Sequence, residues 1–107
     1  MSTEDLKAGR LWVERRFDEI AREFGAPRRL TREDRWREVP ARFAKHNHGM
    51  TYYIELDGHL KRGEVIFWDV DLEIAGTGEV AAREKLGRQI RNEFASSTDA
   101  GSGRKRP

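Results

Sequence analysis

Three carboxylates stand at alternate positions near the middle of the chain, in the stretch GEVIFWDVDLEI from Gly63 to Ile74. If this stretch is a strand, Asp69, Asp71 and Glu73 project from one face and could bind a divalent cation for a metal-dependent hydrolase. Metal sites usually take ligands from several elements, and no second acidic cluster accompanies this row. Arginines of a neighbouring strand would pair with the row equally well, so a hydrolase is the least favoured of three functions.

The histidines form a second candidate metal site. His46 and His48 are two residues apart and point the same way in an extended segment, and His59 could join them across a hairpin. Three imidazoles would suit zinc or nickel. Histidines in turns beside asparagine and glycine often bind no metal, so these residues are weak candidates and we expect no cofactor.

Other catalytic patterns are incomplete. The segment Gly76-Thr77-Gly78 precedes a helix, but it lacks the lysine of a P-loop and Glu79 would repel a phosphate, so a helix cap is favoured. The chain has no cysteine, which excludes thiolate catalysis and disulfides. No serine or threonine stands in the setting of an activated nucleophile. The sequence therefore favours a protein that is not an enzyme.

The net charge is concentrated in the C-terminal segment. The formal net charge of the 107 residues is +2, and Arg104, Lys105 and Arg106 against Asp99 supply that surplus. Because residues 96–107 are rich in serine and glycine, we predict one compact domain over 1–95 and a disordered basic tail over 96–107. No apolar run is long enough to span a bilayer, so we expect a cytoplasmic protein without a membrane partner.

Two helices are predicted from apolar residues at helical spacing. Thr3 can cap the first, which ends at Gly25, and its apolar stripe is Leu6, Val13, Phe17, Ile20 and Phe24. The second opens at Glu79, and its stripe is Ala82, Leu86, Ile90 and Phe94.

Three strands are predicted between these helices. A polar connection over 26–35 leads to an edge strand over 36–45 that Pro40 interrupts. A turn over 46–49 precedes a strand over 50–56, in which Met50, Tyr52 and Ile54 share a face. Asp57-Gly58 is a hairpin signal. The last strand runs over 63–74, and its core-facing side is expected to carry Ile66, Trp68, Val70, Leu72 and Ile74.

These elements predict an α+β fold of order αβββα, with a three-stranded antiparallel meander and both helices on one face of the sheet. The order is similar to that of double-stranded-RNA-binding domains, as is the glycine pair Gly76 and Gly78 before the last helix. The resemblance implies RNA as a ligand. That family grips phosphates with lysines at the start of its final helix, whereas this chain has Glu79-Val80-Ala81-Ala82 there.

The leading functional hypothesis is a small protein-interaction module, such as a regulator, an inhibitor or an adaptor of the kind that mobile elements carry. It would bind a protein partner or a second copy through an aromatic and acidic sheet face. The residues expected on that surface are Trp12, Tyr53, Phe67, Asp69 and Asp71.

The alternative hypothesis is nucleic-acid binding by the arginine-rich segment 28–45, the last helix and the basic tail. The residues expected to contact nucleic acid are Arg28, Arg29, Arg32, Arg35, Arg88, Arg91, Arg104, Lys105 and Arg106.

Overall fold

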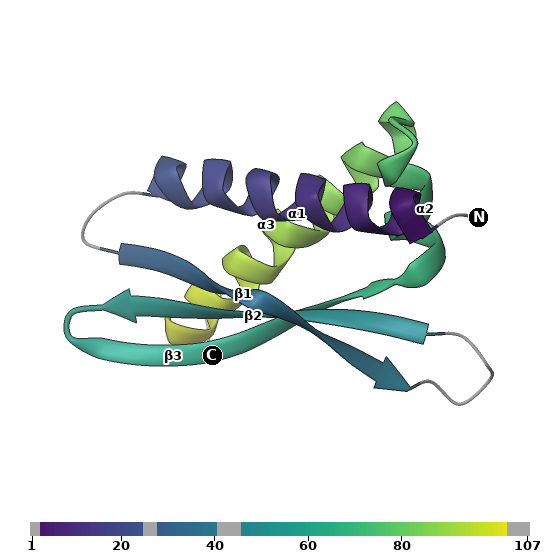
Figure 1. The fold of residues 1–107 in the computed structure, drawn as a ribbon. Coiled ribbons are helices and arrows are strands. Elements are labelled where there is room, and N and C mark those ends of the chain that lie inside the picture. The colour runs from purple at the N-terminus through teal and green to yellow at the C-terminus, as the bar shows by residue number, and fades with distance from the viewer. Residues whose placement is uncertain (1–2, 25–27, 41–45, 103–107) are drawn as a thin grey trace.

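A three-stranded sheet lies beneath a layer of three helices (Figure 1). The computed structural model describes the backbone over 3–24, 28–40 and 46–102, and the side chains over 3–23, 29–39 and 47–94. The elements in chain order are α1 (Thr3–Phe24), β1 (Arg28–Pro40), β2 (His46–Leu56), β3 (His59–Trp68), α2 (Asp69–Gly76) and α3 (Val80–Ser102). The predicted α+β fold is confirmed, with one additional helix.

Helix α1 follows its sequence signals closely. It begins at Thr3, and Glu4 and Asp5 in its first turn complement the positive end of the helix dipole. Val13, Phe17 and Ile20 are fully buried. The predicted stripe therefore faces the core at these residues and at the partly buried Leu6, while the Phe24 side chain lies outside the described set.

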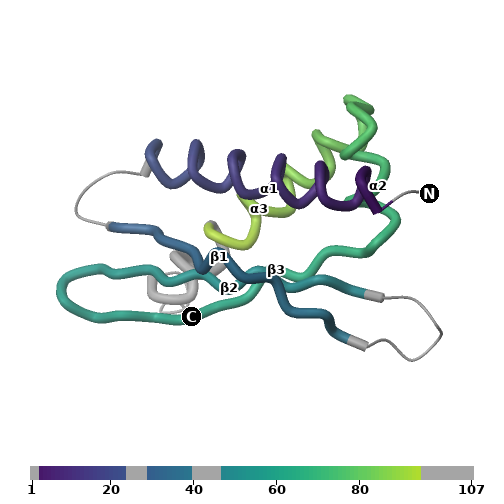
Figure 2. Tube along the Cα trace, viewed as in Figure 1, coloured from purple at the N-terminus to yellow at the C-terminus, as the bar shows by residue number. Residues whose placement is uncertain are grey.

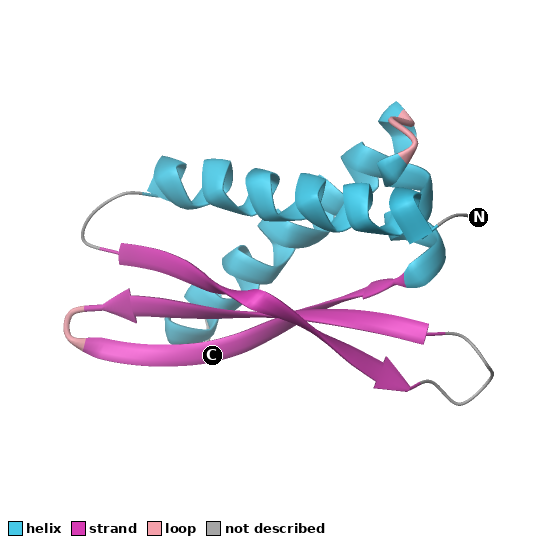
Figure 3. Cartoon of the chain, in the orientation of Figure 1, coloured by secondary structure: helices cyan, strands magenta, loops and turns pink. Residues whose placement is uncertain are grey.

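The sheet is an antiparallel meander of order β1-β2-β3 (Figure 3). The predicted turn at Asp57-Gly58 is confirmed, since both residues have positive φ, as a tight two-residue hairpin requires. Strand β1 is longer than predicted and covers most of the expected polar connection. Strand β2 likewise begins at His46, within the expected turn.

Strand β1 contains a bulge. Arg32 pairs with Tyr52 and Trp36 with Met50, so β1 advances four residues where β2 advances two. Because two residues are extra, both Arg32 and Trp36 point to the helix side, where they contact Asp18 and Glu14 of α1. The side chains of β1 therefore alternate in the same way relative to β2 before and after the bulge.

The predicted strand over 63–74 is wrong in its second half, because the chain turns into helix α2 at Asp69. Trp68 is the last residue of β3 and pairs with Asn47, next to the start of β2. Beyond that point β3 has no neighbour to bond, so the backbone satisfies its own groups as a helix. Asp69 and Asp71 lie in the first turn of α2, where carboxylates are favourable.

The predicted core face of this strand is also wrong. Val65 and Phe67 are buried, whereas Ile66 and Trp68 are exposed. The reason is register, because Val65 pairs with Met50 and shares its face. The apolar residues that had favoured the other face, Val70 among them, belong to α2.

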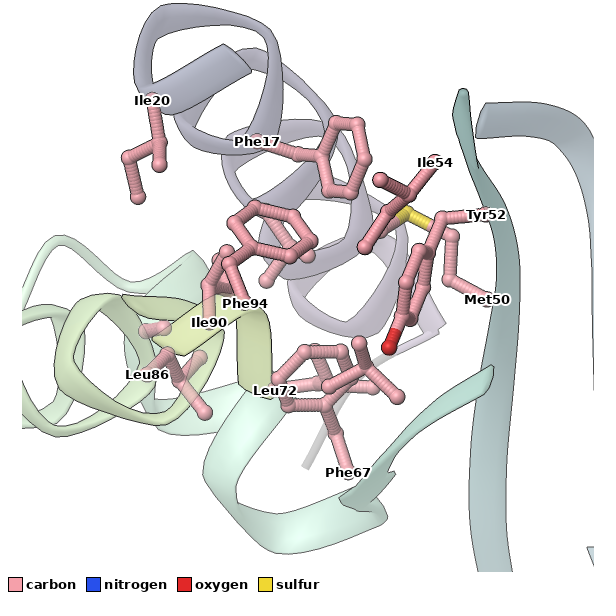
Figure 4. Close-up of a cluster of buried hydrophobic side chains, with 13 residues drawn as sticks. Phe17, Ile20, Met50, Tyr52, Ile54, Phe67, Leu72, Leu86, Ile90 and Phe94 are labelled. Atoms are coloured by element: carbon pink, nitrogen blue, oxygen red, sulfur yellow. The ribbon is translucent and has the colours of Figure 1, made fainter. Parts of the chain in front are cut away.

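The core lies between the helices and one face of the sheet (Figure 4). Phe17 of α1, Tyr52 of β2 and Phe94 of α3 meet there, with the Phe17 and Phe94 ring centroids 4.9 Å apart and nearly perpendicular. Its members are Val13, Phe17, Ile20, Met50, Tyr52, Ile54, Val65, Phe67, Leu72, Ala75, Leu86, Ile90 and Phe94.

Helix α3 continues to Ser102, through most of the segment predicted to be disordered. Arg104, Lys105 and Arg106 lie outside the described residues. The trace in Figure 2 follows the chain from the end of β3 through α2 into α3 on the same side of the sheet as α1.

Candidate functional site

The face of the sheet opposite the helices has no covering element among the described parts of the chain (Figure 1). We call it the open face. The strand register assigns to it Arg29, Thr31, Arg37 and Val39 of β1, Asn47, Thr51, Tyr53 and Glu55 of β2, and Leu60, Arg62, Glu64, Ile66 and Trp68 of β3.

Ion pairs run across the middle of the open face. Arg37 donates two hydrogen bonds to Glu64, Nε to Oε2 at 2.9 Å and Nη2 to Oε1 at 2.7 Å. The pair spans Gly49, where any side chain would overlap the Glu64 carboxylate. The hydrogen bond from Arg37 lowers the pKa of Glu64 below its ordinary value. Thr51 of β2, which pairs with Glu64 of β3, is only 6% exposed.

Further polar pairs neutralise the rest of the open face. Arg29 lies 2.5 Å from Glu55, and the Tyr53 hydroxyl donates to Glu33 of the β1 bulge at 2.5 Å. The register places three arginines on the face, Arg29, Arg37 and Arg62, against the two glutamates Glu55 and Glu64, and Glu33 of the bulge adds a third carboxylate at Tyr53. The open face is therefore close to neutral.

Apolar side chains gather at the end of the open face where β3 meets α2. Ile66 is 39% exposed and Trp68 is 45% exposed. Val39 lies across from Trp68 with Asn47 between them. We call Val39, Ile66 and Trp68 the apolar end. Large apolar side chains are rarely left in water over a continuous area unless something binds there.

The residues predicted for the partner surface do not meet. Tyr53 alone lies on the open face. Phe67 is fully buried beneath the helices, and Trp12 is half-buried in the helix layer. Asp69 and Asp71 belong to α2, where Asp69 contacts His48 and Asp71 accepts a hydrogen bond from Lys85 at 3.2 Å. Ile66 and Trp68 were missed because the sequence placed them in the core.

His48 forms a buried cluster that the sequence did not reveal. The Arg10 guanidinium donates to His48 Nδ1 at 2.6 Å, and Nε2 contacts Asp69 Oδ1. A guanidinium cannot accept, so Nδ1 is the acceptor and Nε2 carries the proton donated to Asp69. The residue is 2% exposed and both ring nitrogens are engaged. His48 therefore joins α1, β2 and α2 and presents no free nitrogen for catalysis or metal binding.

Neither predicted metal site forms among the described residues. In a helix, Asp69, Asp71 and Glu73 no longer share one face. His59 pairs with Leu56, at the opposite end of β2 from His48, and the His46 side chain lies outside the described set. Over the described residues, no group of three histidine or acidic side chains is close enough to hold a metal ion.

The arginine-rich segment does not present one basic surface. Arg29 lies on the open face, whereas Arg32 points to the helix side and donates to both carboxylate oxygens of Asp18 at 3.0 Å. That hydrogen bond raises the pKa of Arg32. Arg35 is exposed in the bulge, and the Arg28 side chain is among those the structure does not describe.

Arg88 and Arg91 lie on α3, at a groove that this helix forms with α1 beside Trp12. Both arginines were predicted from the sequence, but the groove was not. The one sequence signal for the groove is the four-residue spacing of Arg83, Gly87 and Arg91, which puts a glycine between two arginines on one helix face.

No helix in the described ranges is both long enough and apolar enough to cross a membrane. Comparison with models of known protein families, with curated proteins and with solved structures finds no match.

Proposed function

We propose that this protein is a small interaction module that binds through the open face of its sheet, with a second copy of the chain as the occupant. The observation that carries the proposal is the exposure of Ile66 and Trp68 side by side on a face that none of the described helices covers. Full burial of an exposed large apolar side chain contributes about 1.5–3 kcal/mol, and these two, already more than half buried, would each add less than half of that against a partner.

The charge of the open face supports a second copy. A strongly charged face would repel its own copy, because a two-fold contact brings the same surface together twice. Here the three arginines of the face are balanced by Glu55 and Glu64 and by Glu33 of the bulge, which contacts Tyr53. A foreign partner would not require this balance.

A non-enzymatic role accords with this surface, since the polar groups there are engaged with one another. The hydrogen bonds of Arg37 to Glu64 and of Tyr53 to Glu33 leave those carboxylates occupied. A regulator or adaptor that works by contact needs no more than shape and apolar area.

The test is the mass in solution, measured by light scattering coupled to size exclusion. The chain is 12.4 kDa, and we expect twice that mass at a protein concentration of about 100 μM. Ile66→Lys places a cation on the apolar end of both copies, so we expect dimer dissociation at least about tenfold easier.

Leu11→Lys is the matched control. Leu11 is 46% exposed, similar to Trp68, but lies on α1 in the helix layer. This variant should remain dimeric. A monomer for the unmodified chain, or equal loss in both variants, would reject a second copy on the open face.

A further inference from the structure

The groove between α1 and α3 has a composition unlike the open face. It has a volume of about 490 Å³, within the range of small-molecule sites. Its lining includes Trp12 and Arg16 of α1, and Arg83, Gly87, Arg88 and Arg91 of α3. An aromatic ring is thus set among four guanidinium groups.

The groove exists because α3 has a glycine where the helices face each other. A Cβ atom on Gly87 would lie 3.6 Å from Arg16 Nε and 3.9 Å from Trp12 Cη2. Both are ordinary contact distances, so a methyl group would fit, but a larger side chain would enter the space between the helices. At Gly87 the lining of the groove is therefore backbone, with the ends of Arg16 and Trp12 close by.

The groove carries surplus positive charge. Two carboxylates, Glu19 and Glu84, also line it. Arg16 pairs with Glu19 at 2.8 Å. Arg91 pairs with Glu23 at 3.0 Å, and this hydrogen bond raises the pKa of Arg91. Arg88 has no hydrogen-bond or ion-pair partner among the described side chains, so it is available to an anion.

The indole ring adds an apolar wall to this charge. The Arg83 guanidinium carbon lies 5.6 Å from the Trp12 ring centroid, and Arg83 Nε also donates to the Ala75 carbonyl at 2.9 Å. Arg83 is therefore held in place over the ring. Val80, largely exposed, extends the apolar surface at one end.

From these features we propose that the groove binds a nucleotide, either free or as part of a single strand. Guanidinium groups bind phosphate oxygens in pairs of hydrogen bonds. A flat base can stack on the guanidinium plane of Arg83, which lies over the Trp12 ring, and an inorganic anion or an acidic peptide offers no such flat surface. The site is in the helix layer, so it is independent of the proposed contact through the open face.

The experiment is a titration followed by the three indole N–H signals of the tryptophans in a proton–nitrogen NMR spectrum, with the Trp12 signal assigned from Trp12→Phe. The probes are inorganic phosphate, a mononucleotide and a short single-stranded oligonucleotide. We expect the Trp12 signal to shift with both nucleotide probes, and phosphate to bind at least about tenfold more weakly. The tighter of the two nucleotide probes identifies the source.

Two exposed arginines make a matched pair of variants. Arg88→Gln removes the available guanidinium of the groove and should weaken nucleotide binding roughly tenfold. Arg15→Gln removes an exposed arginine of α1 that is not part of the groove lining, and it should leave binding unchanged within about twofold.

Three results would overturn the assignment: no shift of the Trp12 signal with any nucleotide, phosphate binding as tightly as the mononucleotide, or equal losses in Arg88→Gln and Arg15→Gln. Oligonucleotide binding that leaves the Trp12 signal in place would put nucleic acid elsewhere on the protein, which also rejects the groove.

Discussion

Helix α1 contacts both other helices at glycines, with opposite results. Against α2, backbone meets backbone, because a methyl group on Gly9 would overlap the Leu72 carbonyl and one on Gly76 would overlap the Asp5 carbonyl. Against α3, Gly87 faces only the ends of Arg16 and Trp12 at contact distance. The same residue type thus closes one junction and leaves a groove at the other. The atoms opposite the glycine decide whether the two helices come into backbone contact or leave a groove.

The most damaging change should be Gly9→Ala, which forces α1 and α2 apart. Overpacking against a backbone carbonyl cannot be relieved by a side-chain rotation, so we expect the free energy of unfolding to fall by about 3 kcal/mol. Urea unfolding followed by circular dichroism measures this. An unchanged or higher midpoint would show that the two helices are not in backbone contact.

The next largest effect should come from His48→Ala, which removes the link between α1 and α2 made through Arg10 and Asp69. Two charged groups lose their partner, and we expect a loss of about 2 kcal/mol. His59→Ala is the control, since His59 is exposed in the hairpin and should change stability by less than about 0.5 kcal/mol. Equal losses would contradict the buried link.

Gly87→Ala should have the opposite sign from Gly9→Ala. The methyl group finds ordinary contacts, and alanine favours the helix over glycine by about 0.5–1 kcal/mol. The same urea experiment should therefore give a higher midpoint. If Gly87→Ala destabilised the protein as Gly9→Ala does, the junction of α1 with α3 would be as closed as that with α2.

The ion pair of Arg37 with Glu64, which lies over Gly49, should give the smallest effect. Arg37 holds the pKa of Glu64 below 4.5, so the pair stabilises the fold above that pH and the contribution is lost as pH falls through the folded-state value. Arg37→Gln should lower the melting temperature slightly at neutral pH, and the difference should shrink well below pH 4.5. A difference that is constant with pH would mean that the charges do not interact.

Some of the fold follows from local patterns. The spacing of Val13, Phe17 and Ile20 predicted α1, and Asp57-Gly58 predicted the hairpin, because each signal lies within a few residues. The end of β3 could not be predicted in this way. It depends on where β2 begins, a pairing between residues that are about twenty positions apart.

The sequence predicted that the sheet would have an uncovered face, but not which residues line that face. A sheet with helices on one face leaves the other face open, and that expectation needed the element order alone. Which residues line it depends on register. EVIFW is apolar at four successive positions, so Ile66 and Phe67 could not be assigned to opposite faces without knowing that Met50 is opposite Val65. The groove at Gly87 required the packing of two helices that are distant in sequence.

The bulge of β1 has a consequence for how this chain can change in length. The bulge adds two residues to β1. Leu30 and Arg32, before the bulge, and Trp36, after it, therefore all face the helices, as do their partners on β2. Losing or gaining one residue between Arg32 and Trp36 would turn Trp36 outward and bring Arg37 in under α1. We therefore expect this segment to tolerate the insertion or deletion of two residues. Inserting or deleting one residue would exchange the two faces of β1 beyond the bulge.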